Sequence, residues 1–249
     1  MTVQRCFINP GFQKSSVGVP LEPHFDTMLT RMLPGPEDIT VWAWLFQSSS
    51  FQKLQDSAPT DIKGVTNTVS GERITYTELK DYAEHLSMAL VRNCGLQPGD
   101  TVVLLSENSI WFPVAMFAVL RAGARVAGAS PASTVDEMSY YLRVCRAKFV
   151  MTAPNSANIA VAAAQNVGIG RDRIFSLYGV YERLVGIHHL IQVGAQIKES
   201  SYVEAYLIPA GKGNRDICGY LSFTSGTMGR PKAVSDFPLL SADVVTDAR

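Results

Sequence analysis

The residues best suited to chemistry are crowded into one short stretch, Leu221-Ser-Phe-Thr-Ser-Gly-Thr-Met-Gly-Arg-Pro-Lys-Ala-Val234. Its hydroxyl groups can donate hydrogen bonds to phosphate oxygens. The backbone N–H groups beside its glycines can do the same, because a glycine has no Cβ to block an approaching anion. A lysine adds positive charge. The stretch therefore predicts a cradle for phosphate groups, made by Thr224, Ser225, Gly226, Thr227, Gly229 and Lys232.

A surface turn is the plain alternative, since clusters of Ser, Thr, Gly and Pro usually form turns. Pro231 favours the chemical interpretation, because it biases Arg230 toward extended backbone and gives Lys232 a defined direction as the chain leaves the loop. The stretch is not a Walker A loop, in which Gly, Lys and Ser or Thr are adjacent, because two residues separate Gly229 from Lys232. A GTPase or a P-loop ATPase is therefore disfavoured.

The segment from Thr224 to Val234 resembles the phosphate-binding signature of the adenylate-forming (AMP-binding) superfamily. That superfamily includes acyl-CoA synthetases, 4-coumarate-CoA ligase-like enzymes, luciferases and the adenylation domains of peptide synthetases. Met228 stands where the family usually has Thr, and Ala233 stands where it usually has Gly. The likeness runs over about residues 40 to 234, through Gly71-Glu-Arg-Ile-Thr-Tyr-Thr-Glu-Leu79, Gly99-Asp-Thr-Val-Val-Leu-Leu105 and the stretch from Asn108 to Gly123.

This resemblance implies the first part of an acyl-CoA synthetase-like enzyme that activates a small carboxylic acid. In that family the carboxylate attacks the α-phosphate of ATP, pyrophosphate leaves, and a thiol, usually that of CoA, takes the acyl group from the adenylate. ATP, Mg²⁺ and CoA are the implied cofactors. The cradle residues would wrap the β- and γ-phosphates, and Lys232 would neutralise their charge.

Other parts of the family pattern have no counterpart in the sequence: the His after the signature, the adenine- and Mg²⁺-binding element, the ribose-binding Asp and the adenylation lysine. We therefore expect a truncated fragment that is inactive alone, with no catalytic residue or metal ligand of its own. It divides into an irregular lead-in (1–60), a partial AMP-binding N-terminal domain (61–234) and a divergent tail (235–249). The alternative is a non-catalytic binding or regulatory module, a pseudoenzyme that acts on a related ligase.

Charge and cysteine usage restrict the partners and the compartment. Lys plus Arg and Asp plus Glu number 22 each, so there is no basic field for nucleic acid or acidic membranes. Arg121 and Arg125 interrupt the most apolar window, 111–129, which argues against a membrane span. The four cysteines lack the spacing of a metal site or redox motif, which favours reduced thiols and a cytoplasmic protein. Some full-length relatives are peroxisomal, but the final three residues are not a peroxisomal signal.

An alternation of apolar runs and helical patterns predicts an α/β fold. Strands are expected at 101–105, 125–129 and 149–151, with helices between them and a further helix and strand at 158–167 and 173–177. This order favours right-handed crossovers and a mostly parallel sheet with flanking helices, as an incomplete N-terminal domain of an adenylate-forming enzyme. An exposed edge of such a sheet would favour self-association or chaperone binding.

We interpret the residues at the ends of the helices, and the remaining polar residues, as structural and not as functional. Thr77 is the expected N-cap of a helix that closes at Gly95, and Thr134 with Glu137 forms a capping box for a later helix. His188 and His189 are adjacent and share no helix face, so we interpret them as surface or packing residues.

In the apolar island at 41–46, Trp42 and Trp44 are the expected core anchors. Asp136 and Glu137 are interpreted as first-turn charges on a helix, not as a catalytic pair.

Overall fold

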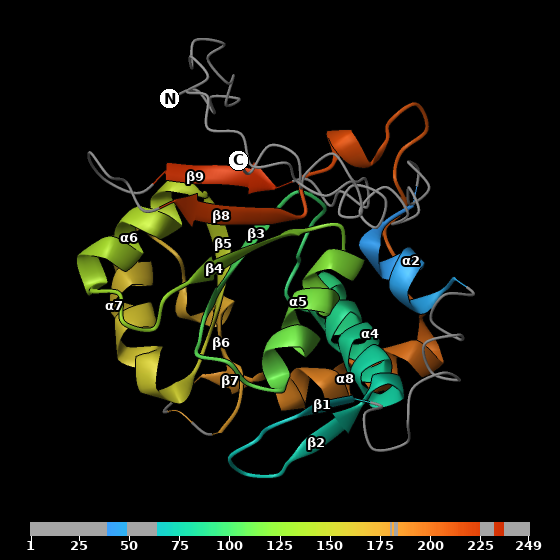
Figure 1. The fold of residues 1–249 in the computed structure, drawn as a ribbon, viewed down its shortest axis with the longest axis horizontal. Coiled ribbons are helices and arrows are strands. Elements are labelled where there is room, and N and C mark those ends of the chain that lie inside the picture. The colour runs from blue at the N-terminus through green and yellow to red at the C-terminus, as the bar shows by residue number, and fades with distance from the viewer. Residues whose placement is uncertain (1–38, 49–63, 180, 182–183, 225–231, 237–249) are drawn as a thin grey trace, which may run out of the picture.

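The computed structural model describes residues 39–48, 64–179, 181, 184–224 and 232–236. Its main strands are β3 (Thr101–Leu105), β4 (Arg125–Ala129), β5 (Ala147–Thr152), β6 (Ile174–Ser176), β7 (Val185–Gly186), β8 (Tyr220–Thr224) and β9 (Lys232–Asp236). They form one seven-stranded sheet in the order β7-β6-β5-β3-β4-β8-β9 (Figure 1). Every neighbouring pair is parallel except β8 and β9, which are antiparallel. The mostly parallel sheet expected from the sequence is confirmed.

Helices cover both faces of this sheet (Figure 1). They are α2 (Val41–Phe46), α4 (Tyr76–Arg92), α5 (Trp111–Arg121), α6 (Val135–Val144), α7 (Ala157–Asn166) and α8 (Ile187–Ser200). The helices α4, α5 and α8 pack on one face, and α6 and α7 pack on the other. A separate antiparallel hairpin joins β1 (Gly64–Thr66) to β2 (Arg73–Thr75). None of the helices in the described ranges has the length and apolar character needed to cross a bilayer.

Strand β3 shows why the sheet needs two apolar cores. Val102 and Leu104 face the core beneath α4 and α5, whereas Val103 and Leu105 face the core beneath α6 and α7. All four side chains are fully buried. Successive side chains of a strand point to opposite faces, so a strand covered on both sides carries apolar residues on both faces.

Capping boxes mark the beginnings of two helices. Thr134 Oγ1 accepts a hydrogen bond from the backbone N–H of Glu137 (3.3 Å), which confirms the predicted box at the start of α6. The predicted N-cap of α4 was wrong, because the helix begins after Thr75 and not at Thr77. Thr75 Oγ1 accepts from the Glu78 N–H (3.2 Å), and the Glu78 carboxylate accepts from the Thr75 N–H (2.8 Å). These reciprocal bonds satisfy two backbone donors at once, which a cap at Thr77 would not do.

The segment 1–60, expected to be an irregular lead-in, contains the short helix α2. Trp42 is buried against the main core, as expected for an anchor, whereas Trp44 is only half-buried. The ring of Trp42 lies 4.6 Å from that of Phe46, and Phe46 meets Phe117 of α5 edge-on. Aromatic contacts therefore attach α2 to the end of the domain near α5.

A connection that we call the strap, residues 201–219, leads from α8 into β8. The backbone N–H of Tyr206 donates to the carbonyl of Arg121 (2.8 Å), and the Tyr206 ring lies over Gly123. A Cβ at Gly123 would come within 2.4 Å of Tyr206 Cγ, and the residue has a φ of +74°. The close approach of the strap to α5 therefore requires glycine at this position.

We expect Gly123→Ala to destabilise the protein, because alanine adds both left-handed strain and an overlap with the Tyr206 ring. The matched control is Gly95→Ala, where φ is also +74° but nothing lies within 4 Å of the new Cβ. The control should lose about 1–2 kcal/mol of unfolding free energy, the cost of the backbone conformation. Gly123→Ala should lose about 1–3 kcal/mol more, measured by urea denaturation. Equal losses of unfolding free energy in the two variants would show that the strap can move away from the new Cβ without cost.

Candidate phosphate-binding site

The structure brings together the two ends of the predicted phosphate cradle. Strands β8 and β9 form an antiparallel hairpin in which Thr224 pairs with Lys232 as the last rung. The first and last cradle residues therefore have neighbouring backbones. Ser225, Gly226, Thr227 and Gly229, the other residues assigned to the cradle, lie outside the described residues.

The end of this hairpin at Thr224 and Lys232 lies at the carboxyl edge of the parallel strands. Strand β8 runs parallel to β4, and β4, β3, β5 and β6 all run in the same direction. The chain therefore leaves β8 at Thr224 on the same edge where it leaves β3, β4, β5 and β6. In open α/β sheets, ligands bind in the crevice outside the carboxyl ends of the strands. The predicted cradle begins at the edge of the sheet where this rule places a ligand.

A polar network that the sequence did not reveal links three other strand ends at this edge. Glu107, just after β3, accepts hydrogen bonds from Asn155 Nδ2 (3.0 and 3.2 Å) and from the Tyr178 hydroxyl (2.9 Å). Asn155 follows β5, and Tyr178 follows β6. Burial raises the pKa of Tyr178 to about 12, and the hydrogen bond to Glu107 adds to the rise. The phenol therefore stays protonated as a donor, and the Glu107 carboxylate is held between three loops.

The network also lies over the point where the order of the strands reverses. From β3 the chain goes through α5 to β4 on one side, then through α6 to β5 on the other side of β3. The two crossover helices lie on opposite faces, which is the arrangement that in other open α/β sheets accompanies a ligand site at the carboxyl ends of the strands. One feature of the sequence could have indicated this network: Ser106, Glu107 and Asn108 are polar residues that directly follow a buried strand.

Apolar packing fixes the base of the hairpin. Tyr220 belongs to the core beneath α4 and α5, whereas Leu221 and Phe223 belong to the core beneath α6 and α7. The Phe223 ring lies 4.4 Å from that of Tyr141 on α6, with the two planes inclined by 37°. Burial raises the pKa of Tyr220 to about 12, so its hydroxyl stays neutral. Both sides of β8 are therefore held before the chain reaches Thr224.

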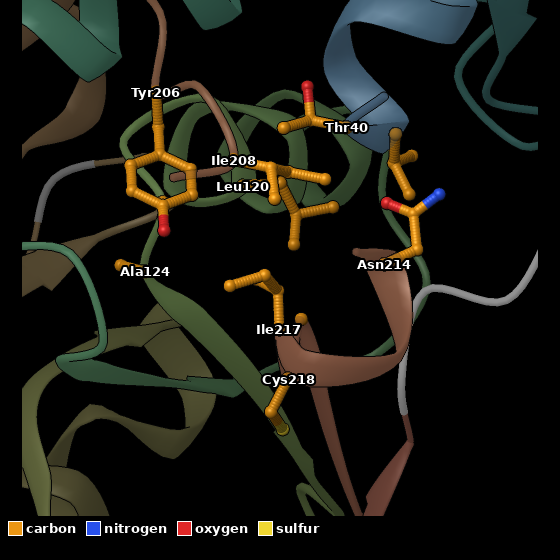
Figure 2. Close-up of a pocket in the computed structure, with 11 residues that line it drawn as sticks. Thr40, Leu120, Ala124, Tyr206, Ile208, Asn214, Ile217 and Cys218 are labelled. Atoms are coloured by element: carbon orange, nitrogen blue, oxygen red, sulfur yellow. The ribbon is translucent and has the colours of Figure 1, made fainter. Parts of the chain in front are cut away.

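A small cavity lies at the other end of these strands, at the residues that precede β4 and β8. It has a volume of about 30 Å³, which is roughly the space of one or two water molecules. Figure 2 shows Tyr206 and Asn214 on opposite sides of it, with Leu120 and Ile217 between them. Gly123 and Gly219 also line it. The cavity is therefore separate from the predicted cradle, at the opposite edge of the sheet.

No group of three or more His, Cys, Asp or Glu side chains that could hold a metal ion occurs in the described part of the chain. His188 packs edge-on against Trp111 (4.1 Å between ring centroids), and His189 is exposed, which agrees with their interpretation as packing and surface residues. Cys94, Cys145 and Cys218 are free thiols. Burial raises the pKa of Cys145 to about 11, so this thiol is not poised to react.

Comparison with known proteins gives consistent results. The family model described as AMP-binding enzyme matches residues 54–235. The acyl-CoA ligase azaF of Aspergillus niger is 27% identical over 192 residues, covering 77% of this chain and 35% of the relative. The phenylacetyl-CoA ligase epaB of the same species is 26% identical over 192 residues, covering 77% of this chain and 34% of the relative. The chain thus spans about a third of the length of these curated relatives.

Among solved structures, the luciferase-like enzyme of the nonluminescent mealworm Zophobas morio superposes with a TM-score of 0.65. It is 17% identical in sequence, and the superposition covers 82% of this chain and 44% of that chain. At this identity the likeness concerns the fold alone, and it confirms the α/β class with its mostly parallel sheet and flanking helices.

Proposed function

The chain belongs to the AMP-binding enzyme family, and from this premise we propose that it supplies the triphosphate-binding part of an ATP-dependent acyl-CoA ligase. The observation that carries the proposal is the β8–β9 hairpin at the carboxyl edge of the parallel sheet, with Thr224 opposite Lys232. A loop anchored there can direct backbone N–H groups and hydroxyls at phosphate oxygens, in the crevice where α/β folds bind their ligands.

The reaction that we propose for the complete enzyme has two steps. A carboxylate oxygen attacks the α-phosphorus of ATP, the bond to the β-phosphate oxygen breaks, and pyrophosphate leaves with the negative charge. A thiol then attacks the carbonyl carbon of the acyl-adenylate, loses its proton, and displaces AMP. In the first step charge grows on the departing pyrophosphate, which the cradle and Lys232 would stabilise.

ATP is proposed from the AMP-binding enzyme family, CoA is proposed from the names of the ligase relatives, and Mg²⁺ is proposed as the ion that accompanies ATP. The cradle residues are suited to phosphate oxygens: hydroxyls, glycine N–H groups and one lysine. The carboxylic acid substrate is proposed to be small, in line with the phenylacetyl group in the name of one relative. A cytoplasmic location and self-association through a sheet edge stay predictions from the sequence.

Lys232→Ala tests the proposal directly. Isothermal titration of pyrophosphate and of Mg²⁺-ATP, at fixed ionic strength, should show affinity that falls about tenfold or more in this variant, since a charge-assisted hydrogen bond is worth about 1.5–3 kcal/mol. The control is Lys212→Ala, which removes an exposed lysine at a turn near the amino end of β8. This variant has the same net charge as Lys232→Ala. Equal affinities in the two variants would show that the loop is a turn and not a phosphate cradle.

A second experiment separates an active ligase from a non-catalytic module. The sequence has no counterpart of the family's adenine- and Mg²⁺-binding element or its adenylation lysine, which favours the second outcome for the isolated chain. We expect pyrophosphate binding without carboxylate-dependent ATP–pyrophosphate exchange and without acyl-CoA formation by mass spectrometry across aryl and fatty acids. Exchange by the purified chain would instead establish it as a complete adenylating unit.

A further inference from the structure

Phe223 is the last described residue before the predicted cradle whose side chain packs into the protein. It occupies the position next to Thr224 on β8, and its ring faces the layer formed by α6 and α7. On the neighbouring strand, Ala233 pairs with Phe223, and Lys232 pairs with Thr224. The packing of this one ring therefore bears on both strands at the point where the loop begins and ends.

Helix α6 provides the surface that Phe223 meets. The helix is firmly seated, because the Thr134–Glu137 capping box closes its first turn, and Met138 and Leu142 are fully buried beneath it. Tyr141 lies on the same helix beside these residues, half-buried, with its ring 4.4 Å from that of Phe223. Helix α6 also contacts β9. A rigid helix thus touches both strands of the hairpin, and Tyr141 is the residue whose ring meets the base of the loop.

We propose that Tyr141 is a positioning residue for phosphate binding, which fixes the β8–β9 hairpin through its ring contact with Phe223 and so holds the cradle in a binding geometry. This inference rests on the proposed function of the loop. The inference requires the ring of Tyr141, because the contact is between two aromatic planes. It does not require the hydroxyl group. Tyr141 does not touch the ligand in this account, and it acts only through the strand it supports.

The experiment compares Tyr141→Ala with two controls, Tyr141→Phe and Tyr140→Ala. Tyr141→Phe keeps the ring, and Tyr140→Ala removes the adjacent tyrosine of the same helix, whose ring lies 6.1 Å from that of Tyr141. Backbone hydrogen exchange, followed by mass spectrometry, is measured for peptides that cover 220–236 and for a remote peptide from α4. Pyrophosphate affinity is measured by calorimetry on the same samples.

In Tyr141→Ala we expect exchange in 220–236 to become about two- to tenfold faster relative to the α4 peptide, the range that one aromatic pair accounts for. Pyrophosphate affinity should fall by a similar factor. Tyr141→Phe should restore both values, and Tyr140→Ala should leave both unchanged. Should Tyr141→Ala fold poorly, Phe223→Leu removes the same ring contact from the other side and is expected to give the same local result.

Unchanged exchange in 220–236, or an increase shared equally by α4, would overturn the proposal, and so would failure of Tyr141→Phe to restore the native values. A native chain that binds no pyrophosphate would contradict the proposed function, and it would remove the phosphate-binding role of Tyr141 with it. The exchange measurement would still decide whether Tyr141 holds the hairpin, so the two failures are distinguishable.

Discussion

Glu84→Ala is expected to destabilise the protein by about 3–5 kcal/mol, because it leaves a buried arginine without its counter-charge. The Arg121 side chain is 1% exposed, and its Nη2 lies 3.5 Å from Glu84 Oε1. The same nitrogen donates to the carbonyl of Val203 (2.7 Å) and to the Tyr202 hydroxyl (3.1 Å). Glu84 in turn pairs with Lys198 of α8 (2.8 Å). One carboxylate thus joins α4, α5, α8 and the strap.

The control for this prediction is Lys198→Ala. The side chain of Lys198 is 40% exposed, so removing it breaks a pair that water already screens, and we expect a loss below about 1 kcal/mol. Urea denaturation of both variants provides the comparison. Similar losses in the two would mean that Arg121 tolerates burial without the carboxylate, through its carbonyl and hydroxyl partners alone.

The same carboxylate makes stability depend on acid. Burial alone would raise the pKa of Glu84, but hydrogen bonds from Lys198 and Tyr202 and the positive charges of Lys198 and Arg121 outweigh it, so the pKa lies below its ordinary value. The contribution to stability is therefore complete above the pKa of the unfolded state, about 4.3, and is lost as the pH falls through the lower folded value. The unfolding free energy of Glu84→Gln should depend less steeply on pH in this range than that of the native protein.

Gly194→Ala is the second change for which we expect a large effect, although alanine is the better helix former by about 1 kcal/mol. Gly194 lies inside α8, where that helix crosses α4, and a Cβ there would stand 1.7 Å from the carbonyl oxygen of His85. The obstacle is backbone, so the two helices must separate. We expect a net loss of about 2 kcal/mol or more in urea denaturation, since overpacking commonly costs 1–3 kcal/mol.

Gly128→Ala is the matched control for this substitution. Its new Cβ meets nothing within 4 Å, and the residue needs no left-handed backbone, so its stability should change little or rise slightly. A Gly194→Ala variant as stable as the native protein would show that α8 can shift on α4 without loss of packing.

Local patterns predicted much of the fold. The strands at 101–105 and 125–129 begin and end at the predicted residues, because each is a short apolar run next to a turn at Gly99 or Gly123, both of which have positive φ. Helix α8 escaped prediction, since a glycine and two adjacent histidines obscure its apolar face. Gly194 is explained only by the helix it touches, which lies about a hundred residues earlier in the chain.

In the candidate site, too, a local motif could be recognised from the sequence, and contacts between distant residues could not be predicted. The hairpin that joins Thr224 to Lys232 is a local feature, but the motif at 224–232 predicted only a phosphate cradle, and the strand at 232–236 was not predicted. The network around Glu107 was not predictable, because its partners Asn155 and Tyr178 are 48 and 71 residues away in sequence. From the sequence, Arg121 is only an argument against a membrane span, whereas in the structure it lies in the protein interior. Contacts of this kind arise from the topology of the sheet, and a single sequence carries no periodic signal for them.

The place of β8 in the sheet has a consequence for the order of folding. Strands β3 to β6 succeed one another along the chain with a helix between them, so each can dock soon after the one before. Strand β8 pairs with β4, and Tyr220 meets Val126 across almost a hundred intervening residues. Pairings that close long loops form slowly, whereas the β8–β9 hairpin closes a short one. We therefore expect the hairpin, which would carry the proposed phosphate loop, to join the sheet late, so a bound nucleotide would act on the final docking step and not on the collapse of the core.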